Sequence, residues 1–165
     1  MTINIKNFLK DKSKLSKMGE YQNLKQIDGL EMASISADLK PRIRSVVLRS
    51  IDQTKKTVRF HTDIRAEKYA ELTANPYLAL HFYDETKKVQ IRLETTACLY
   101  NRDEVAAEAW SLSQPMSKVC YATTIPPGAS VLTPPAALSL EEANMEIGYG
   151  NFAVVEGAIN YLEWL

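Results

Sequence analysis

Hydrophobic and polar residues alternate with a period of two through much of the chain after residue 30. Alternation of this kind predicts strands with one buried face. The short polar turns DLKP, DQTKK and DETKK separate neighbouring segments, which favours antiparallel pairing and a meander for the first three. The segments are LEMASISA (30–37), IRSVVLRSI (43–51), TVRFH (57–61), YLALHFY (77–83), KVQIRLETTACLY (88–100) and FAVVEGAINYLEWL (152–165).

Helical spacing occurs in four shorter places. An amphipathic helix is expected at about 4–18. A second is expected at about 64–74, with Asp63 as its cap and Asn75-Pro76 at its end. Asn101 and Glu104 resemble a capping box for a third helix through Leu112. A short helix is expected at 115–122, followed by a proline-rich loop at about 123–138.

These elements predict one domain over residues 1–165, mainly β, with five or six antiparallel strands and helices at one side. A small Greek-key barrel has this combination. In the segment 88–100, Val89, Ile91, Leu93 and Leu99 share one face while Gln90, Arg92 and Glu94 share the other. We therefore expect one face of this strand to pack in a core and the other to meet something polar.

Composition narrows the class of protein. The chain has 165 residues, with 20 Lys plus Arg against 20 Asp plus Glu. The balanced charge argues against a nucleic-acid binder, and no apolar run has the ~18–20 residues of a membrane helix. The basic N-terminal residues have no apolar core of a signal peptide. The two cysteines lack metal-ligand spacing, so we expect a cytoplasmic protein without a metal site.

Arginines are unusually frequent in one predicted strand. Arg42, Arg44 and Arg49 fall within eight residues of strong strand formers. They either decorate a solvent face or bind an anion, because a guanidinium matches phosphate oxygens. Strict alternation puts Arg44 and Arg49 on opposite faces, so a shared site requires a bulge, a strong twist or a ligand lying across the strand end.

Two cations fall on the apolar arc of the helix predicted at 64–74. At 100° per residue, Arg65 and Lys68 lie beside Tyr69 and Leu72. Both are in the first turns, where free N–H groups and the helix dipole favour an anion. A bound phosphate accounts for them better than snorkelling of their stems to water.

Other chemistry has less support. His61 and Thr62 end the strand before this helix, and a Thr hydroxyl there can donate to a phosphate. His81 is interpreted as a core histidine, and Gln90 has an amide suited to a heterocycle edge. The sequence contains no GxSxG, HExxH, GxxxxGK[ST] or GxGxxG motif.

Taken in order, the motifs RSVVLR (44–49), FHTDIRAEK (60–68), NP (75–76) and VQIRLE (89–94) resemble the flavin-binding signature of the pyridoxamine 5′-phosphate oxidase-like family. The similarity covers about residues 25–100. It implies a six-stranded FMN-binding split barrel and a homodimer in which two subunits build each FMN site.

The resemblance also implies roles for particular residues. Arg44 and Lys68 match cations at the FMN phosphate, and Arg65 substitutes for an arginine whose place is taken by Glu67. Gln90 matches the glutamine at the flavin pyrimidine edge, and Arg49 the basic residue beside the ring. His61 and Thr62 match residues near the ribityl phosphate, and the remaining cofactor positions are Ser45, Val46 and Val47.

The chain departs from the true oxidase where that enzyme binds its substrate. Trp110, Gln114 and Lys118 stand where the resemblance expects Tyr, Arg and Ser, and NYLEWL lacks an Arg-x-His motif. Fewer cations mean weaker recognition of a substrate phosphate. We therefore expect an FMN-dependent oxidoreductase acting on a small molecule other than pyridoxamine phosphate. A non-catalytic FMN carrier, or a barrel that binds another anion, are the alternatives.

Overall fold

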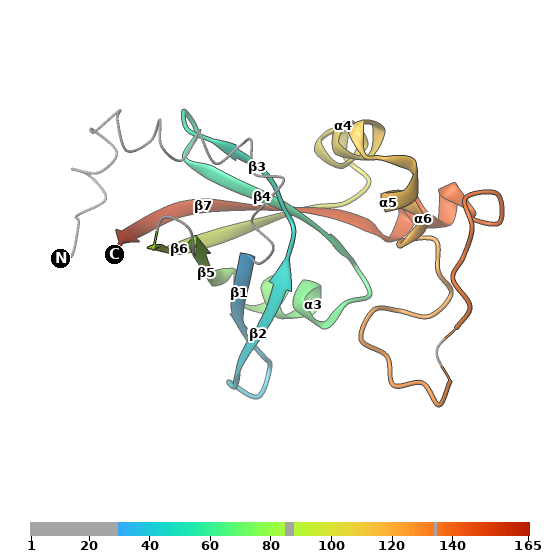
Figure 1. The fold of residues 1–165 in the computed structure, drawn as a ribbon, viewed down its shortest axis with the longest axis horizontal. Helices are drawn as coiled ribbons and strands as arrows, with labels where there is room; N and C mark the ends of the chain where they lie inside the picture. Colours follow the sequence, from blue (N-terminus) through green and yellow to red (C-terminus); the bar gives the residue numbers. More distant parts are fainter. Residues whose placement is uncertain (1–29, 85–87, 134) are drawn as a thin grey trace. The chain divides into compact units, whose positions relative to one another are not determined.

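The computed structural model describes residues 30–84, 88–133 and 135–165 (Figure 1). The expected helix at about 4–18 lies outside the described residues. The strands are β1 (Leu30–Ile35), β2 (Pro41–Val46), β3 (Leu48–Asp52), β4 (Thr57–Asp63), β5 (Tyr77–Asp84), β6 (Val89–Tyr100) and β7 (Phe152–Trp164). The helices are α3 (Glu67–Ala74), α4 (Glu104–Leu112), α5 (Pro115–Val119) and α6 (Met145–Asn151).

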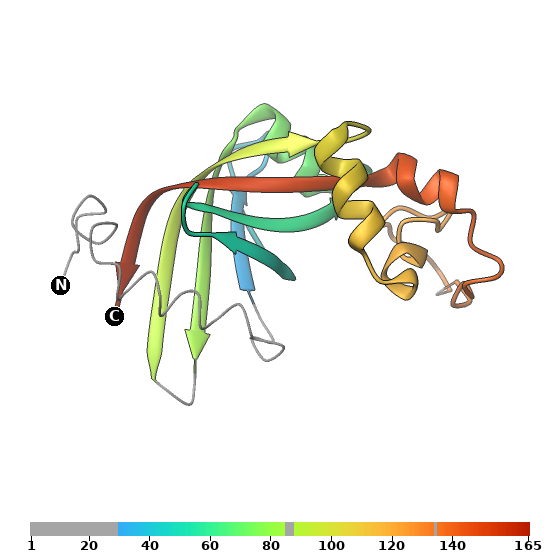
Figure 2. The same ribbon diagram turned by 90° about the horizontal axis from the view of Figure 1, so that it is seen from above.

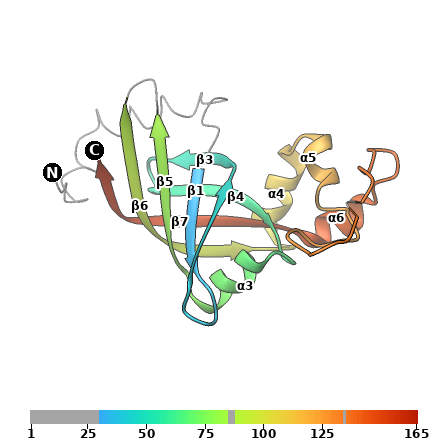
Figure 3. The ribbon, with the colours of Figure 1, turned by 60° about the horizontal axis from the view of Figure 1, so that its bottom comes forward.

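The strands form one sheet in the order β2-β1-β5-β6-β7-β4-β3. Antiparallel pairing joins β1 to β2 and to β5, β5 to β6, and β3 to β4. Figures 2 and 3 show the long strand β7 lying between β6 and β4. This arrangement confirms the antiparallel barrel class predicted from the alternating pattern.

The sheet has seven strands rather than six, because the segment predicted as one strand over 43–51 is broken at Val47. β2 pairs with β1, whereas β3 pairs with β4 at the other end of the sheet order. A single residue joins the two edge strands, so the sheet must curl until its edges meet there, as a half-barrel does. The predicted meander of the first three strands is therefore wrong, since β2 and β3 are not neighbours.

The described chain divides into two compact units, and each has its own core. The first contains residues 30–60, 71–98 and 156–165, and the second contains residues 61–70 and 99–155. Fully buried side chains of the first unit are Leu30, Met32, Val58, Phe60, Leu72, Leu80, Leu93 and Leu162. The second unit packs Trp110, Tyr121 and Val105 against buried Ala106, Ala109, Phe152 and Val154. The prediction of a single domain over 1–165 stays a prediction.

Two predicted helices start later than expected, each for a local reason. Residues 64–66 form a turn, so α3 begins at Glu67 and Asp63 caps that turn instead of the helix. Asp103 rather than Asn101 caps α4, accepting a hydrogen bond from the Ala106 N–H at 2.8 Å. Asn101 instead donates from Nδ2 to the carbonyl oxygen of Phe152 at 2.7 Å.

The later part of the chain follows the prediction with one addition. The short helix expected at 115–122 is α5, which ends at Val119. The described residues of the loop 123–138 contain neither helix nor strand. The helix α6 has no counterpart in the sequence prediction; the side chain of Asn144 caps it by accepting from the Glu146 and Ile147 N–H groups.

Candidate functional site

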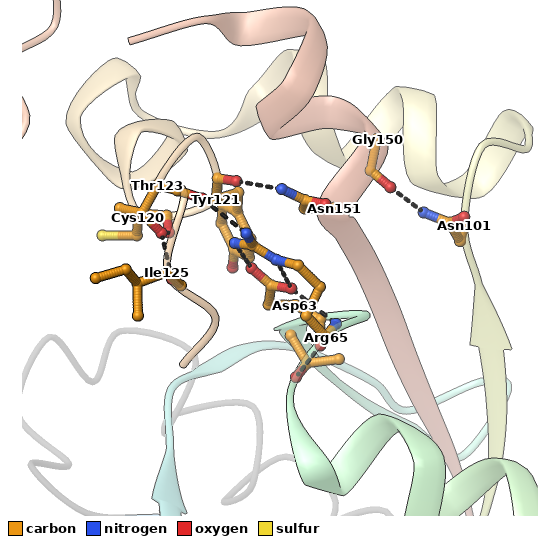
Figure 4. Close-up of polar contacts among 10 residues, drawn as sticks. Asp63, Arg65, Asn101, Cys120, Tyr121, Thr123, Ile125, Gly150 and Asn151 are labelled. Atoms are coloured by element: carbon orange, nitrogen blue, oxygen red, sulfur yellow. Dashed lines mark hydrogen bonds and ion pairs between the residues drawn. The ribbon is translucent and has the colours of Figure 1, made fainter. Parts of the chain in front are cut away.

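The turn between β4 and α3 is built around an ion pair. Arg65 donates from Nε to Oδ1 of Asp63 at 2.9 Å and from Nη2 to Oδ2 at 2.7 Å, in the two-pronged geometry shown in Figure 4. The backbone N–H of Arg65 donates to the same Oδ1 at 2.8 Å. The Asp63 side chain is 4% exposed and that of Arg65 is 23% exposed. The hydrogen bonds with Asp63 raise the pKa of Arg65 above its ordinary value, so the guanidinium stays charged.

Arg65 also connects this turn to the segment that leads into the proline-rich loop. Its Nη1 donates to the carbonyl oxygen of Thr123 at 2.7 Å. Asn151 makes two further connections. Its Nδ2 donates to the carbonyl of Tyr121 at 2.8 Å (Figure 4). Its own backbone carbonyl accepts from the Ile64 N–H at 2.8 Å. The turn, residues 121–123 and the end of α6 are therefore held together, and part of the Arg65 guanidinium is committed to this role.

Arg44 has its own carboxylate in the other compact unit. Its Nη2 donates to Oε2 of Glu71 at 2.8 Å, and its Nη1 donates to Oγ of Ser34. The Ser34 hydroxyl in turn donates to the same Glu71 oxygen. Glu71 is 7% exposed, whereas the Arg44 side chain is 21% exposed. The guanidinium thus binds a buried carboxylate, while the Arg44 side chain as a whole is partly exposed.

The rest of the arginine-rich segment, residues 46–49, lies where β2 ends and β3 begins. The pairing of β3 with β4 shifts between Leu48 and Ser50, which leaves Arg49 as the bulged residue. Strict alternation puts Arg44 and Arg49 on opposite faces of a strand, and a bulge is one of the irregularities that would let both side chains serve a single site. Val47 and Arg49 are exposed, and Val46 is half-buried.

Ser45 and Gln90 lie on strands of the same unit. The Ser45 hydroxyl donates to Oε1 of Glu31 at 3.2 Å. Gln90 is half-buried near the start of β6, and its backbone N–H and carbonyl pair with Leu165 at 3.0 and 2.9 Å. Two residues further along the same face of β6, Arg92 forms an ion pair with Glu163. The polar face predicted for this strand is therefore observed.

His61, Thr62 and Lys68 belong to the second unit. The His61 ring meets Phe152 edge to face, with centroids 4.8 Å apart. Thr62 is buried, and its hydroxyl donates to the Asp63 carbonyl at 3.5 Å, which is at the outer limit of a hydrogen bond. Lys68 is half-buried in the first turn of α3. Arg65 precedes the helix, so the predicted helical face shared by Arg65 and Lys68 is wrong.

The positions that depart from the oxidase lie in the second unit. The Lys118 Nζ lies over the Trp110 ring, 5.4 Å from its centroid. The Gln114 carbonyl caps α5 by accepting from the Ser117 and Lys118 N–H groups. The Trp110 ring also packs against Tyr149 and Phe152. At the positions where the resemblance expects Tyr and Ser, the chain therefore has an aromatic ring, Trp110, with the ammonium group of Lys118 above it.

Sequence reasoning missed the carboxylates that hold the two arginines. A signal for Glu71 existed, because it lies three residues after Lys68 on the same helix and beside buried Leu72. Asp63 was noticed as a helix cap only. Thr123, which contributes a backbone carbonyl, had no sequence signal at all.

Among the described residues, no group of three or more His, Cys, Asp or Glu side chains is placed to hold a metal ion. None of the helices in this part of the chain combines the length and apolar character needed to cross a bilayer. Cys98 and Cys120 are both exposed and unpaired with each other.

Comparison with known proteins decides the family. The model of the family described as "Pyridoxamine 5'-phosphate oxidase, FMN-binding domain" matches residues 7–101, more than half of the chain. The chain belongs to this family. The match includes the arginine-rich strand segment, the turn with Asp63 and Arg65, the helix α3 and the strand β6.

Individual relatives agree with the family assignment. The chain is 34% identical over 68 residues to a pyridoxine/pyridoxamine 5′-phosphate oxidase of Chromobacterium violaceum, covering 41% of this chain and 31% of the relative. It is 31% identical over 67 residues to the enzyme of that name from Gluconobacter oxydans, covering 41% and 32%. The matched segment thus spans about a third of the length of these curated relatives.

Solved structures share the fold over nearly the whole chain. A pyridoxamine 5′-phosphate oxidase-related, FMN-binding protein of Nostoc punctiforme superposes with a TM-score of 0.70 at 16% identity, covering 94% of this chain and 82% of that one. PhzG from Burkholderia lata, solved with tetrahydrophenazine-1-carboxylic acid, gives a TM-score of 0.70 at 17% identity, covering 95% and 82%. These likenesses confirm the split-barrel fold.

Proposed function

We propose that this protein binds FMN and acts as an FMN-dependent oxidoreductase on a small molecule other than pyridoxamine 5′-phosphate. The observation that carries the proposal is the family match over residues 7–101, which contains the cations expected at the flavin phosphate. FMN, when bound, supplies hydride and electron transfer through its ring, and the protein binds and orients it.

The donor chemistry of the chain fits a flavin phosphate. Arg44 and Arg65 each have a partly exposed side chain, and Lys68 adds an ammonium group at the start of α3. Planar guanidinium groups suit phosphate oxygens, and the hydroxyl of Thr62 is only weakly engaged within the chain. From the family match, each of these residues is proposed individually as a ligand of the phosphate.

The remaining proposed residues concern the rest of the flavin. Arg49, at its bulge, is proposed to lie near the isoalloxazine ring and to stabilise negative charge on the reduced form. Gln90 is proposed to orient the pyrimidine edge through its amide. His61 and the backbone of Ser45, Val46 and Val47 complete the proposed set.

We propose a substrate other than pyridoxamine phosphate because of the side chains at three positions in the second unit. Trp110 and Lys118 form a cation–π pair, and Gln114 has no charge with which to bind a phosphate. A planar substrate with modest negative charge fits an aromatic ring with one lysine beside it better than a phosphate monoester does.

A homodimer is proposed, with the outer face of β2, β1 and β5 as part of its interface. Ile43 is 71% exposed and Tyr77 66% exposed on this face. Between them, Ala33 and Ala79 line depressions of about 270 and 470 Å³. Charged side chains, among them Glu31, Arg92 and Glu94, line these depressions as well. Large exposed apolar side chains gathered on one face are typical of a surface that another protein covers.

The test uses the protein as purified. Absorbance in the flavin bands and mass spectrometry of the released molecule must identify FMN. Reduction of the bound flavin by a nicotinamide donor, followed by reoxidation on a panel of small molecules, then separates an oxidoreductase from a carrier. A colourless protein that does not take up added FMN contradicts the proposal.

A further inference from the structure

Arg44 is held by two side chains from other elements before any ligand arrives. Glu71 on α3 accepts from Nη2 at 2.8 Å, and Ser34 on β1 accepts from Nη1. The Ser34 hydroxyl donates a hydrogen bond to the same Glu71 oxygen. The three groups form a closed network between β1, β2 and α3.

Burial makes this network rigid. Ser34 and Glu71 are both buried, so neither is able to exchange its partners freely for water. A buried carboxylate without a counter-charge is strongly unfavourable, which ties Glu71 to Arg44 in the folded protein. The Arg44 side chain is therefore fixed in one orientation, and its ordering is not left to be completed by the ligand.

The Arg44 guanidinium retains donors that Glu71 and Ser34 do not engage. It has five N–H donors, of which Glu71 and Ser34 engage two. Among the residues that the structure describes, no other partner of the Arg44 guanidinium is found. A fixed fork with remaining donors is the arrangement that recognises a planar pair of phosphate oxygens.

The negative charge of Glu71 limits how strongly Arg44 attracts a phosphate from a distance. Because Glu71 cancels the charge of Arg44, the pair attracts a phosphate dianion weakly at a distance. Its contribution must come from correctly placed hydrogen bonds at contact. Attraction at a distance has to come from charges other than this pair.

We propose that Glu71, supported by Ser34, is the positioning residue that orients Arg44 toward the phosphate of the flavin. The inference rests on the FMN function proposed above. It assigns to a buried acid on α3 a part in phosphate recognition, although the acid itself would repel the phosphate.

The test compares FMN with riboflavin, which lacks the phosphate. The ratio of the Kd for riboflavin to the Kd for FMN, from quenching of flavin fluorescence, isolates the phosphate contribution. We expect Arg44→Ala and Glu71→Ala each to lower this ratio by about tenfold, with the riboflavin Kd unchanged within about twofold. Glu71→Gln, which retains an acceptor oxygen for Arg44, is expected to keep the ratio within about threefold of the wild type.

The matched control is Glu156→Ala. Glu156 accepts from Arg59 at 2.8 Å and its side chain is 17% exposed, so its removal also breaks a sheltered ion pair. This variant must leave the ratio unchanged. A general loss of stability lowers both affinities together and leaves the ratio intact.

The outcomes are distinct. A wild type that binds neither flavin overturns the proposed function and this inference with it. A wild type that prefers FMN, with a ratio that Glu71→Ala leaves unchanged or raises, overturns the positioning role alone. If Glu71→Ala does not fold, Ser34→Ala is measured instead. An unchanged ratio of the two Kd values in Ser34→Ala then contradicts the positioning role.

Discussion

The guanidinium of Arg65 and the carboxylate of Asp63 face each other across two hydrogen bonds of 2.9 and 2.7 Å. A third contact from Arg65, to the Thr123 carbonyl, brings residue 123 to the turn before α3. One side chain therefore organises both the start of α3 and the segment that leads into the proline-rich loop.

Replacing Arg65 by Ala is expected to destabilise the protein. The change leaves the buried Asp63 carboxylate without its counter-charge and the Thr123 carbonyl without a donor. We expect a loss of about 3 kcal/mol in the free energy of unfolding, measured by urea denaturation. Lys40→Ala is the control, because its pair with Asp38 is exposed and contributes little. Equal stabilities of the Arg65 variant and the wild type would falsify the role of this ion pair.

The turn at 139–142 is expected to depend on pH. Ser139 donates from its hydroxyl at 2.7 Å and from its backbone N–H at 3.0 Å to Glu142, which lowers the pKa of that carboxyl. A lowered folded-state pKa contributes stability above the unfolded value, and this contribution is lost as the pH falls through the folded value. NMR titration should place the Glu142 midpoint below that of an ordinary glutamate. Ser139→Ala should move the midpoint upward; an unmoved midpoint contradicts the assignment.

Gly148→Ala is expected to disturb the aromatic cluster around Trp110. A Cβ at residue 148 would lie 3.1 Å from Cη2 of the Trp110 ring and 3.5 Å from the Ala122 Cβ. The ring is packed on other sides by Tyr121 and Tyr149, so it has little room to yield. We expect a cost of about 1–3 kcal/mol in unfolding and altered tryptophan fluorescence. Gly128→Ala, where a Cβ meets nothing within 4 Å, tests instead the cost of a positive φ.

The sheet was predictable from the sequence because its strands alternate clearly. In β6, Ile91 and Leu93 are buried while Arg92 and Glu94 are exposed, as the pattern requires. The break at Val47 was not predictable from alternation. The residues on both sides of Val47 favour a strand, although β2 and β3 lie at opposite edges of the sheet. The apolar run Val46–Leu48 was the only local sign of the break.

Helix boundaries depended on contacts that the sequence pattern does not carry. The turn at 64–66 exists because Asp63 accepts hydrogen bonds from Arg65, although Asp63 also has the chemistry of a helix cap. The helix α6 contains Gly148 and Gly150, which lower helix propensity, and its cap Asn144 is the main signal for it.

The sequence points to the cations of the proposed site and not to their partners. Arg44 and Arg65 stand out by residue type and position, and their place in an FMN site stays a prediction. Glu71 is 27 residues from Arg44, and Thr123 is 58 residues from Arg65, so both contacts are set by the tertiary fold. A sequence gives the charge of a side chain, whereas its counter-charge is known only once the chain is folded.

A single charge on the exposed sheet face is expected to disrupt the proposed dimer. Ile43→Glu places a carboxylate where an apolar side chain is 71% exposed, which costs little in an isolated subunit. Burying that carboxylate at an interface is strongly unfavourable. Light scattering after size exclusion should show a dimer for the wild type and a monomer for the variant. A wild-type monomer, or an unaffected dimer, contradicts the proposed interface.

The most direct test of the account is the affinity for FMN of the wild type and of Lys68→Ala, with Lys55→Ala as an exposed-lysine control. Equilibrium titration of flavin fluorescence gives each Kd. We predict saturable binding by the wild type, a Kd for Lys68→Ala higher by about tenfold or more, and no change in the control. Absence of FMN binding by the wild type, or equal affinity of all three proteins, would contradict it.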